Sequence, residues 1–151
     1  MAQNTAPIFT KTPVTAFGTL PSTITASARS DGVGTIATDI VKIFTAKAVD
    51  GSYVSKVRIS AAATTPTTMT ATVIRLFISS ITSGATTAAD TVLFAEIAVA
   101  AITAANSANA TNYYDIPFNI ALPASYTILA SIHVAPAANT RWQLLTVGGD
   151  Y

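Results

Sequence analysis

The side chains that could support catalysis are few, and His133 is the first of them. It is the single histidine of the chain, and the sequence contains no cysteine. Zinc sites are built from several histidine, cysteine or carboxylate ligands, so a histidine pair and a thiolate set are both excluded. Ser131 lies on the same face of a predicted strand, but a hydroxyl and an imidazole on one strand do not form a catalytic triad. No carboxylate has a spacing that fixes it as the third member.

The acidic residues offer little more. Glu96 is the only glutamate, which excludes a glutamate pair of the glycosidase kind and leaves an Asp–Glu pair open. The last four residues, Gly148-Gly149-Asp150-Tyr151, superficially resemble the GGDEF signature of diguanylate cyclases. They do not precede a helix as a phosphate loop does. We interpret them as a flexible turn that folds the final ring onto the body, with calcium at Asp150 as the alternative. We therefore predict no enzymatic activity, no catalytic residues, no cofactor and no metal site.

The composition is typical of a chain whose surface is covered. Half of the residues are hydrophobic and 10% are charged, whereas globular proteins carry about a quarter charged residues. Alanine (29 residues) and threonine (25 residues) make up more than a third of the 151 residues. Such a surface suggests packing against copies of the chain or a partner. The lack of cysteine excludes disulfides and leaves the redox compartment undetermined.

The few charges are unevenly distributed along the chain. Residues 1–75 hold seven basic and three acidic residues (+7 − 3 = +4), and residues 76–151 hold one basic and four acidic residues (+1 − 4 = −3). One interpretation is a basic patch that docks on an acidic partner or on the acidic side of a neighbouring copy. The alternative is that both halves interleave in one sandwich. The net charge of +1 gives no reason to expect nucleic-acid binding.

No targeting or membrane segment is predicted. The start, MAQNTAPIFTKTP, lacks the basic and apolar regions of a signal peptide. The most apolar stretch, 92–105, includes Glu96 and is shorter than the roughly 18 residues that a membrane helix needs. We expect a protein that is made in the cytosol and does not contact membranes.

The elements that must position these residues are predicted to be strands. From Gly34 onwards apolar and polar residues alternate with period 2. In 54–61, for example, Val57 and Ile59 fall on one face, and Lys56 and Arg58 fall on the other. Further strands are predicted over 35–46, 70–79, 92–100, 112–120, 125–134 and 140–147. Alanine-rich 85–110 could form a helix, but its β-branched residues favour strand plus loop.

The fold class predicted from this pattern is all-β, a single antiparallel β-sandwich or jelly-roll-like domain. Residues 1–30 carry prolines at 7, 13 and 21, which favour extended geometry. We predict that they form an extended N-terminal arm, with one edge strand over 14–20, and that 31–151 form the sandwich. The alternative for the arm is a disordered tail. An arm of this kind commonly orders only against a neighbour.

Aromatic residues leave two alternatives open. Trp142, the only tryptophan, lies beside Arg141 in a predicted strand. It is either an interface anchor, since tryptophan and arginine are enriched in binding hot spots, or a core residue. The same choice applies to Tyr113-Tyr114. A sugar-binding platform would need exposed aromatics with several polar neighbours, and no such cluster is visible.

Four stretches together resemble a group of small structural proteins of tailed bacteriophages. They are GTIATDIVKIFTAKAVDG (34–51), VIRLFI (73–78), LPASYTILAS (122–131) and the final GGDY (148–151). The order of these motifs, with an acidic AEI-type strand between the second and third, covers most of the chain from about residue 30. One departure is Ser125, where the pattern often has glycine.

The resemblance implies a virion component with a β-sandwich or jelly-roll fold. A capsid cement or decoration protein fits best, bound on the capsid surface to the major capsid protein and to copies of itself, as a dimer or trimer made in the host cytoplasm. The alternatives are another virion part (tail, neck, head fibre or receptor-binding tip) and a carbohydrate-binding module. The predicted interface residues are Ile8, Phe9, Lys11, Phe17, Arg29, Lys56, Arg58 and Trp142.

Overall fold

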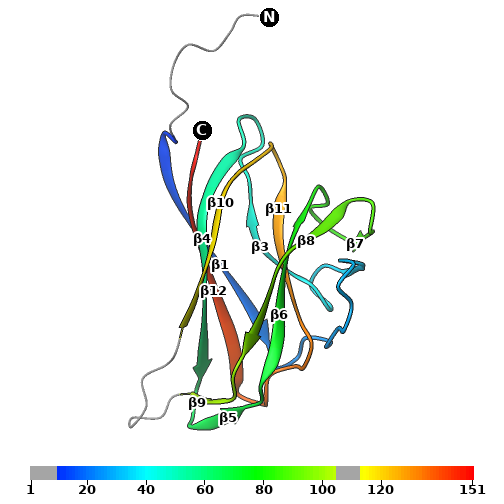
Figure 1. Ribbon diagram of the computed structural model, residues 1–151, viewed down its shortest axis with the longest axis vertical. Helices are drawn as coiled ribbons and strands as arrows, with labels where there is room; N and C mark the ends of the chain where they lie inside the picture. Colours follow the sequence, from blue (N-terminus) through cyan, green and yellow to red (C-terminus); the bar gives the residue numbers. More distant parts are fainter. Residues whose placement is uncertain (1–9, 105–112) are drawn as a thin grey trace, which may run out of the picture.

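The computed structural model describes residues 10–104 and 113–151 (Figure 1). Within these ranges the chain is all-β and contains no helix. The strands are β1 (Thr12–Pro21), β2 (Gly34–Thr35), β3 (Val41–Thr45), β4 (Ser52–Ala63), β5 (Thr67–Met69), β6 (Thr72–Ser79), β7 (Ala85–Thr86), β8 (Thr91–Val99), β9 (Ile102–Ala104), β10 (Tyr113–Leu122), β11 (Thr127–Ile132) and β12 (Thr140–Asp150).

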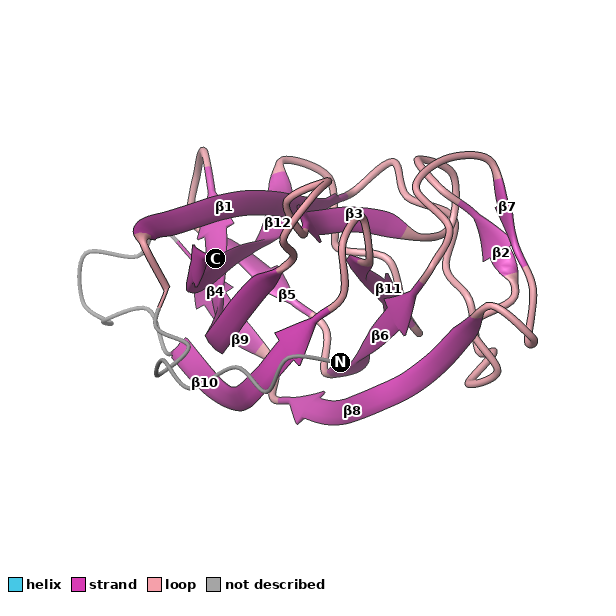
Figure 2. Ribbon diagram, turned by 90° about the horizontal axis from the view of Figure 1, so that it is seen from above, coloured by secondary structure: helices cyan, strands magenta, loops and turns pink. Residues whose placement is uncertain are grey.

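Two four-stranded antiparallel sheets form the body of the molecule. The first sheet has the order β1-β12-β4-β10, and the second has the order β3-β11-β6-β8. Figure 2 shows them from above, with the first sheet at the left and the second at the right. Two short pairs, β2 with β7 and β5 with β9, complete the pairing. The predicted antiparallel β-sandwich is confirmed.

The eight strands of these two sheets pair in a nested order. The first of them, β1, pairs with the last, β12; β3 pairs with β11, β4 with β10, and β6 with β8. This winding is that of a jelly roll, an eight-stranded double sheet. Strands of the first half of the chain therefore pair with strands of the second half in reverse order, and the paired strands are divided between two packed sheets.

The core lies between the sheets and follows the alternation of the sequence. In β4 the side chains of Val57, Ile59 and Ala61 are buried, while those of Lys56 and Arg58 point away from the core and are half-buried. Burying an aliphatic side chain of this size contributes roughly 1.5–3 kcal/mol. The period-2 prediction for this strand is confirmed, as is strand rather than helix over the described part of 85–110.

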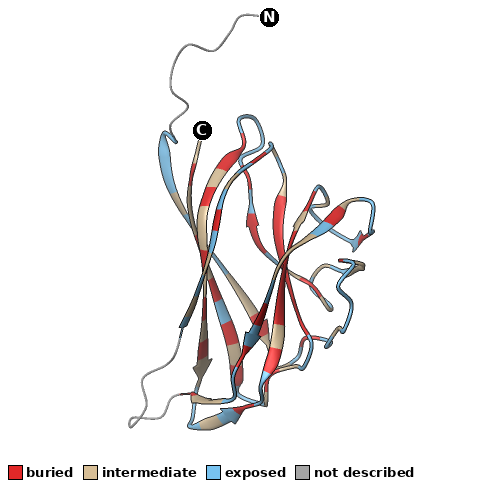
Figure 3. Ribbon diagram, viewed as in Figure 1, coloured by how far each residue is buried: buried red, intermediate tan, exposed pale blue. Residues whose placement is uncertain are grey.

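The outer face of the second sheet is also covered, by residues 22–40, which we call the covering segment. Ile40, Phe77 and Leu129 form a small separate cluster there, and every residue of β11 is buried. Figure 3 shows the resulting continuous burial along β11 and the alternation along β12. The backbone N–H of Ser27 donates to the carbonyl of Ile132 at 2.9 Å.

The covering segment interrupts one predicted strand. Residues 35–46 read as a single strand in the sequence, but they form β2 and β3 with a turn between them. Ala37 in this turn has a φ of 74°, in the left-handed region. The turn lets Ile40 face the outside of the second sheet instead of continuing the alternation of β3.

The edge strand predicted over 14–20 is found as part of β1, at the edge of the first sheet. The predicted N-terminal arm, however, needs a correction. Residues 12–21 are strand β1 of the first sheet, and residues 22–30 belong to the covering segment, so the described part of 1–30 is integral to the sandwich. Prolines are tolerated on an edge strand where the missing N–H faces away from the neighbouring strand. For this reason Pro13 and Pro21 do not prevent pairing. Ile8 and Phe9 lie outside the described residues.

The final glycines are not a flexible turn, which corrects a second prediction. Gly148 and Gly149 lie inside β12, at a register shift opposite β4. A Cβ added to Gly148 would lie 2.1 Å from the carbonyl oxygen of Tyr53, so only glycine fits this close approach. Tyr151 does lie against the body, because its carbonyl oxygen accepts a bond from Nζ of Lys47 at 2.9 Å.

Candidate interaction surface

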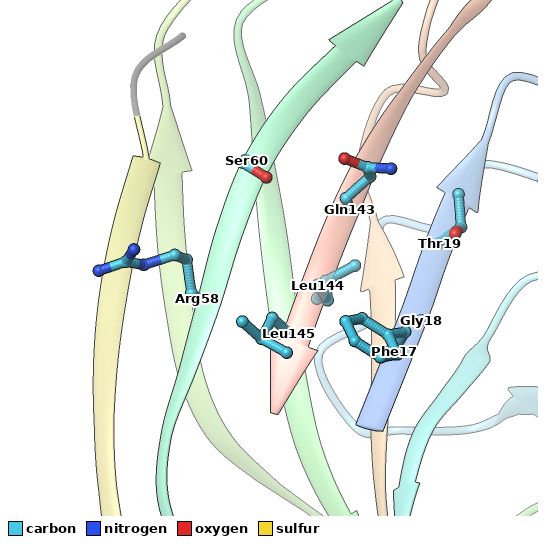
Figure 4. Close-up of a pocket in the computed structure, with 8 residues that line it drawn as sticks. All are labelled: Phe17, Gly18, Thr19, Arg58, Ser60, Gln143, Leu144 and Leu145. Carbon is cyan, nitrogen blue, oxygen red and sulfur yellow. The ribbon is translucent and has the colours of Figure 1, made fainter. Parts of the chain in front are cut away.

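The outer face of the first sheet carries a groove, lined by residues of three neighbouring strands (Figure 4). They are Phe17, Gly18, Thr19, Arg58, Ser60, Gln143, Leu144 and Leu145. Phe17 is the most exposed of the large groups here, with 78% of its surface accessible. In Figure 4 its ring lies over β1 on the side of Leu145, and the Arg58 side chain extends towards the neighbouring β10.

The strand registers explain why these residues share one face. Phe17 pairs with Leu145, Leu145 pairs with Arg58, and Arg58 pairs with Asp115. Paired residues point to the same side of a sheet, so these four form one row across all four strands. The next row is Thr19, Gln143, Ser60 and Tyr113.

A cluster of charges occupies the side of this face formed by β4 and β10. Arg58 makes two bonds to Asp115, Nε to Oδ1 at 2.7 Å and Nη2 to Oδ2 at 2.7 Å, and Nζ of Lys56 lies 3.0 Å from the same Oδ2. The hydrogen bonds from Arg58 and then Lys56 hold the pKa of the Asp115 carboxyl well below its usual range. Since one carboxylate serves two cations, the cluster keeps a positive charge.

Exposed aromatic rings lie on both edge strands of this face. Tyr113 on β10 is 60% exposed, and its ring lies 4.1 Å from the guanidinium carbon of Arg58. Phe17 is on β1, at the opposite edge of the sheet. A ring beside a guanidinium gains from the cation–π attraction. The face therefore combines two exposed aromatic groups, partly exposed aliphatic side chains such as Leu145, and a net basic cluster.

The structure brings only some of the predicted interface residues together. Phe17, Lys56 and Arg58 lie on this face. Lys11 is exposed just before β1, where its backbone N–H donates to the carbonyl of Asp150 at 2.8 Å. Arg29 belongs to the covering segment and pairs there with Asp31, Nε to Oδ1 at 3.0 Å.

Trp142 lies in the core and not at the surface. It is 1% exposed and makes an edge contact with Tyr114, with 6.5 Å between the ring centroids. Its position in β12 places it on the inward-facing set with Leu144, since side chains alternate along a strand. Of the two interpretations of Trp142, the core position is the one found, and we remove this residue from the candidate interface.

Several members of the face were missed in the sequence, and Leu145 and Asp115 show two different reasons. Leu145 follows from alternation alone, because it has the parity of Gln143 and Arg141, which are not buried. Asp115 could not be found in this way. Its place depends on β10 lying next to β4, and this neighbour relation joins residues that are 57 positions apart. The pairing also shows that basic residues of the first half meet acidic residues of the second, as the interleaving alternative requires.

Ser131 and His133, the residues first considered for catalysis, differ in their exposure to solvent. Ser131 is buried and its hydroxyl has no hydrogen-bond partner, whereas His133 is exposed. Among residues 10–104 and 113–151, no three His, Cys, Asp or Glu side chains gather as metal ligands would. Nor does this described part contain a helix that is long and apolar enough to cross a membrane.

Over residues 10–104 and 113–151, fold and face define a jelly-roll β-sandwich in which one sheet face is covered and the other is open. Comparison with protein-family models, with curated proteins and with solved structures gave no match to this chain.

Proposed function

We propose that this protein is a structural, non-enzymatic component of a bacteriophage virion. In this role it is a cement or decoration protein that binds the lattice of the major capsid protein and stabilises the head. The observation that carries the proposal is the open outer face of the first sheet. It holds Phe17, Tyr113 and Arg58 in exposed or half-exposed positions on rigid strands.

The face has the composition of a protein-binding surface. Aromatic residues and arginine dominate binding hot spots, and here an exposed ring and a guanidinium are held together at 4.1 Å. Burying apolar surface contributes roughly 25 cal/mol per Å². A partner that covers the row from Phe17 to Asp115 would gain this term, and its acidic groups would complement the basic cluster.

The fold and the sequence resemblance support the same role in different ways. Jelly rolls occur in viral capsid domains and in lectins, so the fold alone does not choose between a virion part and a sugar-binding module. The resemblance of four motifs to those of small phage structural proteins favours the virion. The low content of charged residues, 10%, also fits a surface that is covered in an assembly.

Copy number per particle tests the proposal. In purified virions we expect on the order of hundreds of copies, because a cement protein follows the symmetry of the capsid lattice. A stoichiometry of about a dozen or fewer would instead indicate a tail, neck or fibre part. The virion proposal is overturned if the protein never co-purifies with particles.

The face itself is tested by adding back purified protein to heads that lack it. Tyr113→Ser should weaken binding at least tenfold, since an exposed aromatic hot spot is lost. Val49→Ser is the matched control, because Val49 is 80% exposed and lies in the turn before β4. Equal loss in both variants, or in neither, contradicts docking through this face.

A further inference from the structure

The four edge strands of the sandwich differ in how they are protected against pairing with another chain. Natural edge strands carry charges, bulges or prolines, or are very short. β10 has Asp115, Pro117 and a register shift, and β8 has Glu96 and a register shift in its pairing with β6. β3 is only five residues long and contains Lys42.

β1 has none of these features between its prolines. It is ten residues long, contains no charged residue and pairs with β12 without a register shift. Prolines occur only at Pro13 and Pro21, near or at the ends of the strand. The seven residues between them therefore present a regular strand whose outer edge no other described strand pairs.

The prolines also determine which backbone groups point outwards. Alternate residues of an antiparallel strand bond the neighbour on one side, and the others face the opposite side. Pro13 and Pro21 have no N–H to give to β12, and both stand at odd-numbered positions, so they face the same side of the strand. The residues of that parity between them, Thr15, Phe17 and Thr19, consequently direct their N–H and C=O groups to the unpaired edge.

Phe17 lies midway between the prolines, four residues from each. An antiparallel strand placed on this edge with Phe17 opposite its own copy would also set Thr15 opposite Thr19. Pro13 would then lie opposite Pro21. We propose that β1 is a homodimer interface, at which two copies of this chain pair β1 with β1 around a two-fold axis through Phe17.

The proposed pairing specifies the hydrogen bonds and the strand order of the dimer. Each copy supplies three N–H donors (Thr15, Phe17 and Thr19) to carbonyls of the other, which gives six bonds. Both first sheets then join into one sheet in the order β10-β4-β12-β1-β1-β12-β4-β10. Paired side chains share a face of the sheet, so the two exposed Phe17 rings lie side by side on the outer face.

The facing prolines make this a closed pair. Pro13 and Pro21 are the outermost positions of β1 that face the free edge, and neither has an N–H. The ladder of hydrogen bonds therefore ends at both sides. A two-fold contact uses the same patch on both subunits and is saturated by one partner. The dimer does not depend on the virion role, because it uses only the chain itself.

The oligomeric state of the purified full-length chain tests the proposal. Light scattering after size exclusion should give about 31 kDa, twice the chain mass of 15.5 kDa. Phe17→Lys should give the monomer mass, because two ammonium groups would face each other at the axis. Val49→Lys, at a site that is also exposed, should remain dimeric. Circular dichroism confirms that both variants fold.

Disulfide trapping tests the register. Because the chain contains no cysteine, an introduced cysteine has no native thiol to pair with. Residues in a hydrogen-bonded antiparallel pair have Cα atoms about 5.5 Å apart, within the range of about 4.4–6.8 Å that a disulfide bridges. Phe17→Cys should therefore form a covalent dimer on oxidation. Thr15→Cys alone should not, because its copy is offset by four residues, about 13 Å along the strand. Thr15→Cys combined with Thr19→Cys should cross-link again.

Three results would overturn the proposal: a wild-type chain that is monomeric at every concentration, a dimer that Phe17→Lys leaves intact, or cross-linking by Thr15→Cys but not by Phe17→Cys. Particle association is measured separately. A monomer that still binds virions would refute only the dimer, and a dimer that never binds them would refute only the virion role.

Discussion

The two sheets of this sandwich share one core but treat their outer faces in opposite ways. The second sheet is closed by the covering segment, whose Ile40 packs on Phe77 and Leu129. The first sheet has no such cover among the described residues, and Phe17 stands 78% exposed on it. The chain thus uses about twenty of its residues to bury one face and leaves the other open.

The difference shows that exposure of the first sheet is not a failure of packing. The same chain holds its covering segment with two specific contacts: Arg75 Nη1 donates to the Ser27 carbonyl at 3.3 Å, and the Thr86 hydroxyl donates to the Gly32 carbonyl at 2.6 Å. Exposed aromatic groups together with an arginine are typical of binding surfaces. The open face is the one that remains available to partners.

A pair of phenylalanine truncations should separate the two faces most strongly. Phe77→Ala removes a ring that is 1% exposed and should lower the free energy of unfolding by about 3–5 kcal/mol. Phe17→Ala should change the stability of the monomer by less than about 0.5 kcal/mol, as expected for a surface site. Denaturant titration measures both.

Repeating both measurements at several protein concentrations distinguishes Phe17 from Phe77 further. Any stabilisation that depends on Phe17 should grow with concentration, because a dimer is favoured by mass action. The loss caused by Phe77→Ala should be the same at all concentrations. Similar losses from both truncations would contradict the distinction between a covered and an open face.

Gly148→Ala tests whether the open sheet is tightly built despite its exposed face. A Cβ at this position would lie 2.1 Å from the carbonyl oxygen of Tyr53 in the neighbouring strand. The backbone must shift to relieve this contact, so we expect a loss of about 3 kcal/mol. Thermal unfolding gives the loss, and Val147→Ala, on the adjacent half-exposed residue, is the control with a smaller effect.

Arg75→Met tests how the covering segment is held. Arg75 is 8% exposed, and its Nη1 donates to the Ser27 carbonyl of the covering segment at 3.3 Å. Without this donor and the bond to Glu96, stability should fall by about 2 kcal/mol. Hydrogen exchange should increase within residues 22–40 more than in β4. Uniform exchange across both regions would show that the segment does not open separately.

The smallest effect is expected at the charged cluster of the open face. The pKa of Asp115 lies below its unfolded value because Arg58 and Lys56 bond the ionised form. The stabilisation it brings is therefore complete at neutral pH and is lost only as the pH falls through this lowered value. Because the side chain is 34% exposed, the contribution should stay below about 1 kcal/mol.

A carboxyl NMR titration measures this directly. The midpoint for Asp115 should lie well below the ordinary value of 3.8, and Arg58→Met should raise it. A midpoint near 3.8 in the wild-type protein would show that the pairs with Arg58 and Lys56 do not persist in solution.

Local pattern predicted the strands well and their outer surroundings poorly. Alternation in 54–61 assigned Val57 and Ile59 to the core, since one strand suffices to define a buried face. The same rule read 35–46 as one strand, because it does not detect the left-handed turn at Ala37. Nor does it say that a segment elsewhere will cover Phe77 and Leu129.

The candidate site shows the same limit. Phe17, Lys56 and Arg58 were predicted from residue type, but their partners Leu145 and Asp115 depend on which strands become neighbours. The turn at Ser125 is the opposite case. Its φ of 65° is one that glycine adopts most easily, and the local sequence around Leu122-Pro123 was enough to mark this position as a turn.

The nested strand order has a consequence for how the chain folds. β12 lies between β1 and β4, and its register joins Thr12 to Asp150, residues separated by most of the sequence. The first sheet cannot close until residues 140–150 are available, so nascent chains expose the facing edges of β1 and β4. Folding dominated by such distant contacts takes roughly milliseconds to seconds. Refolding of a chain truncated before Thr140 should stop short of the native state.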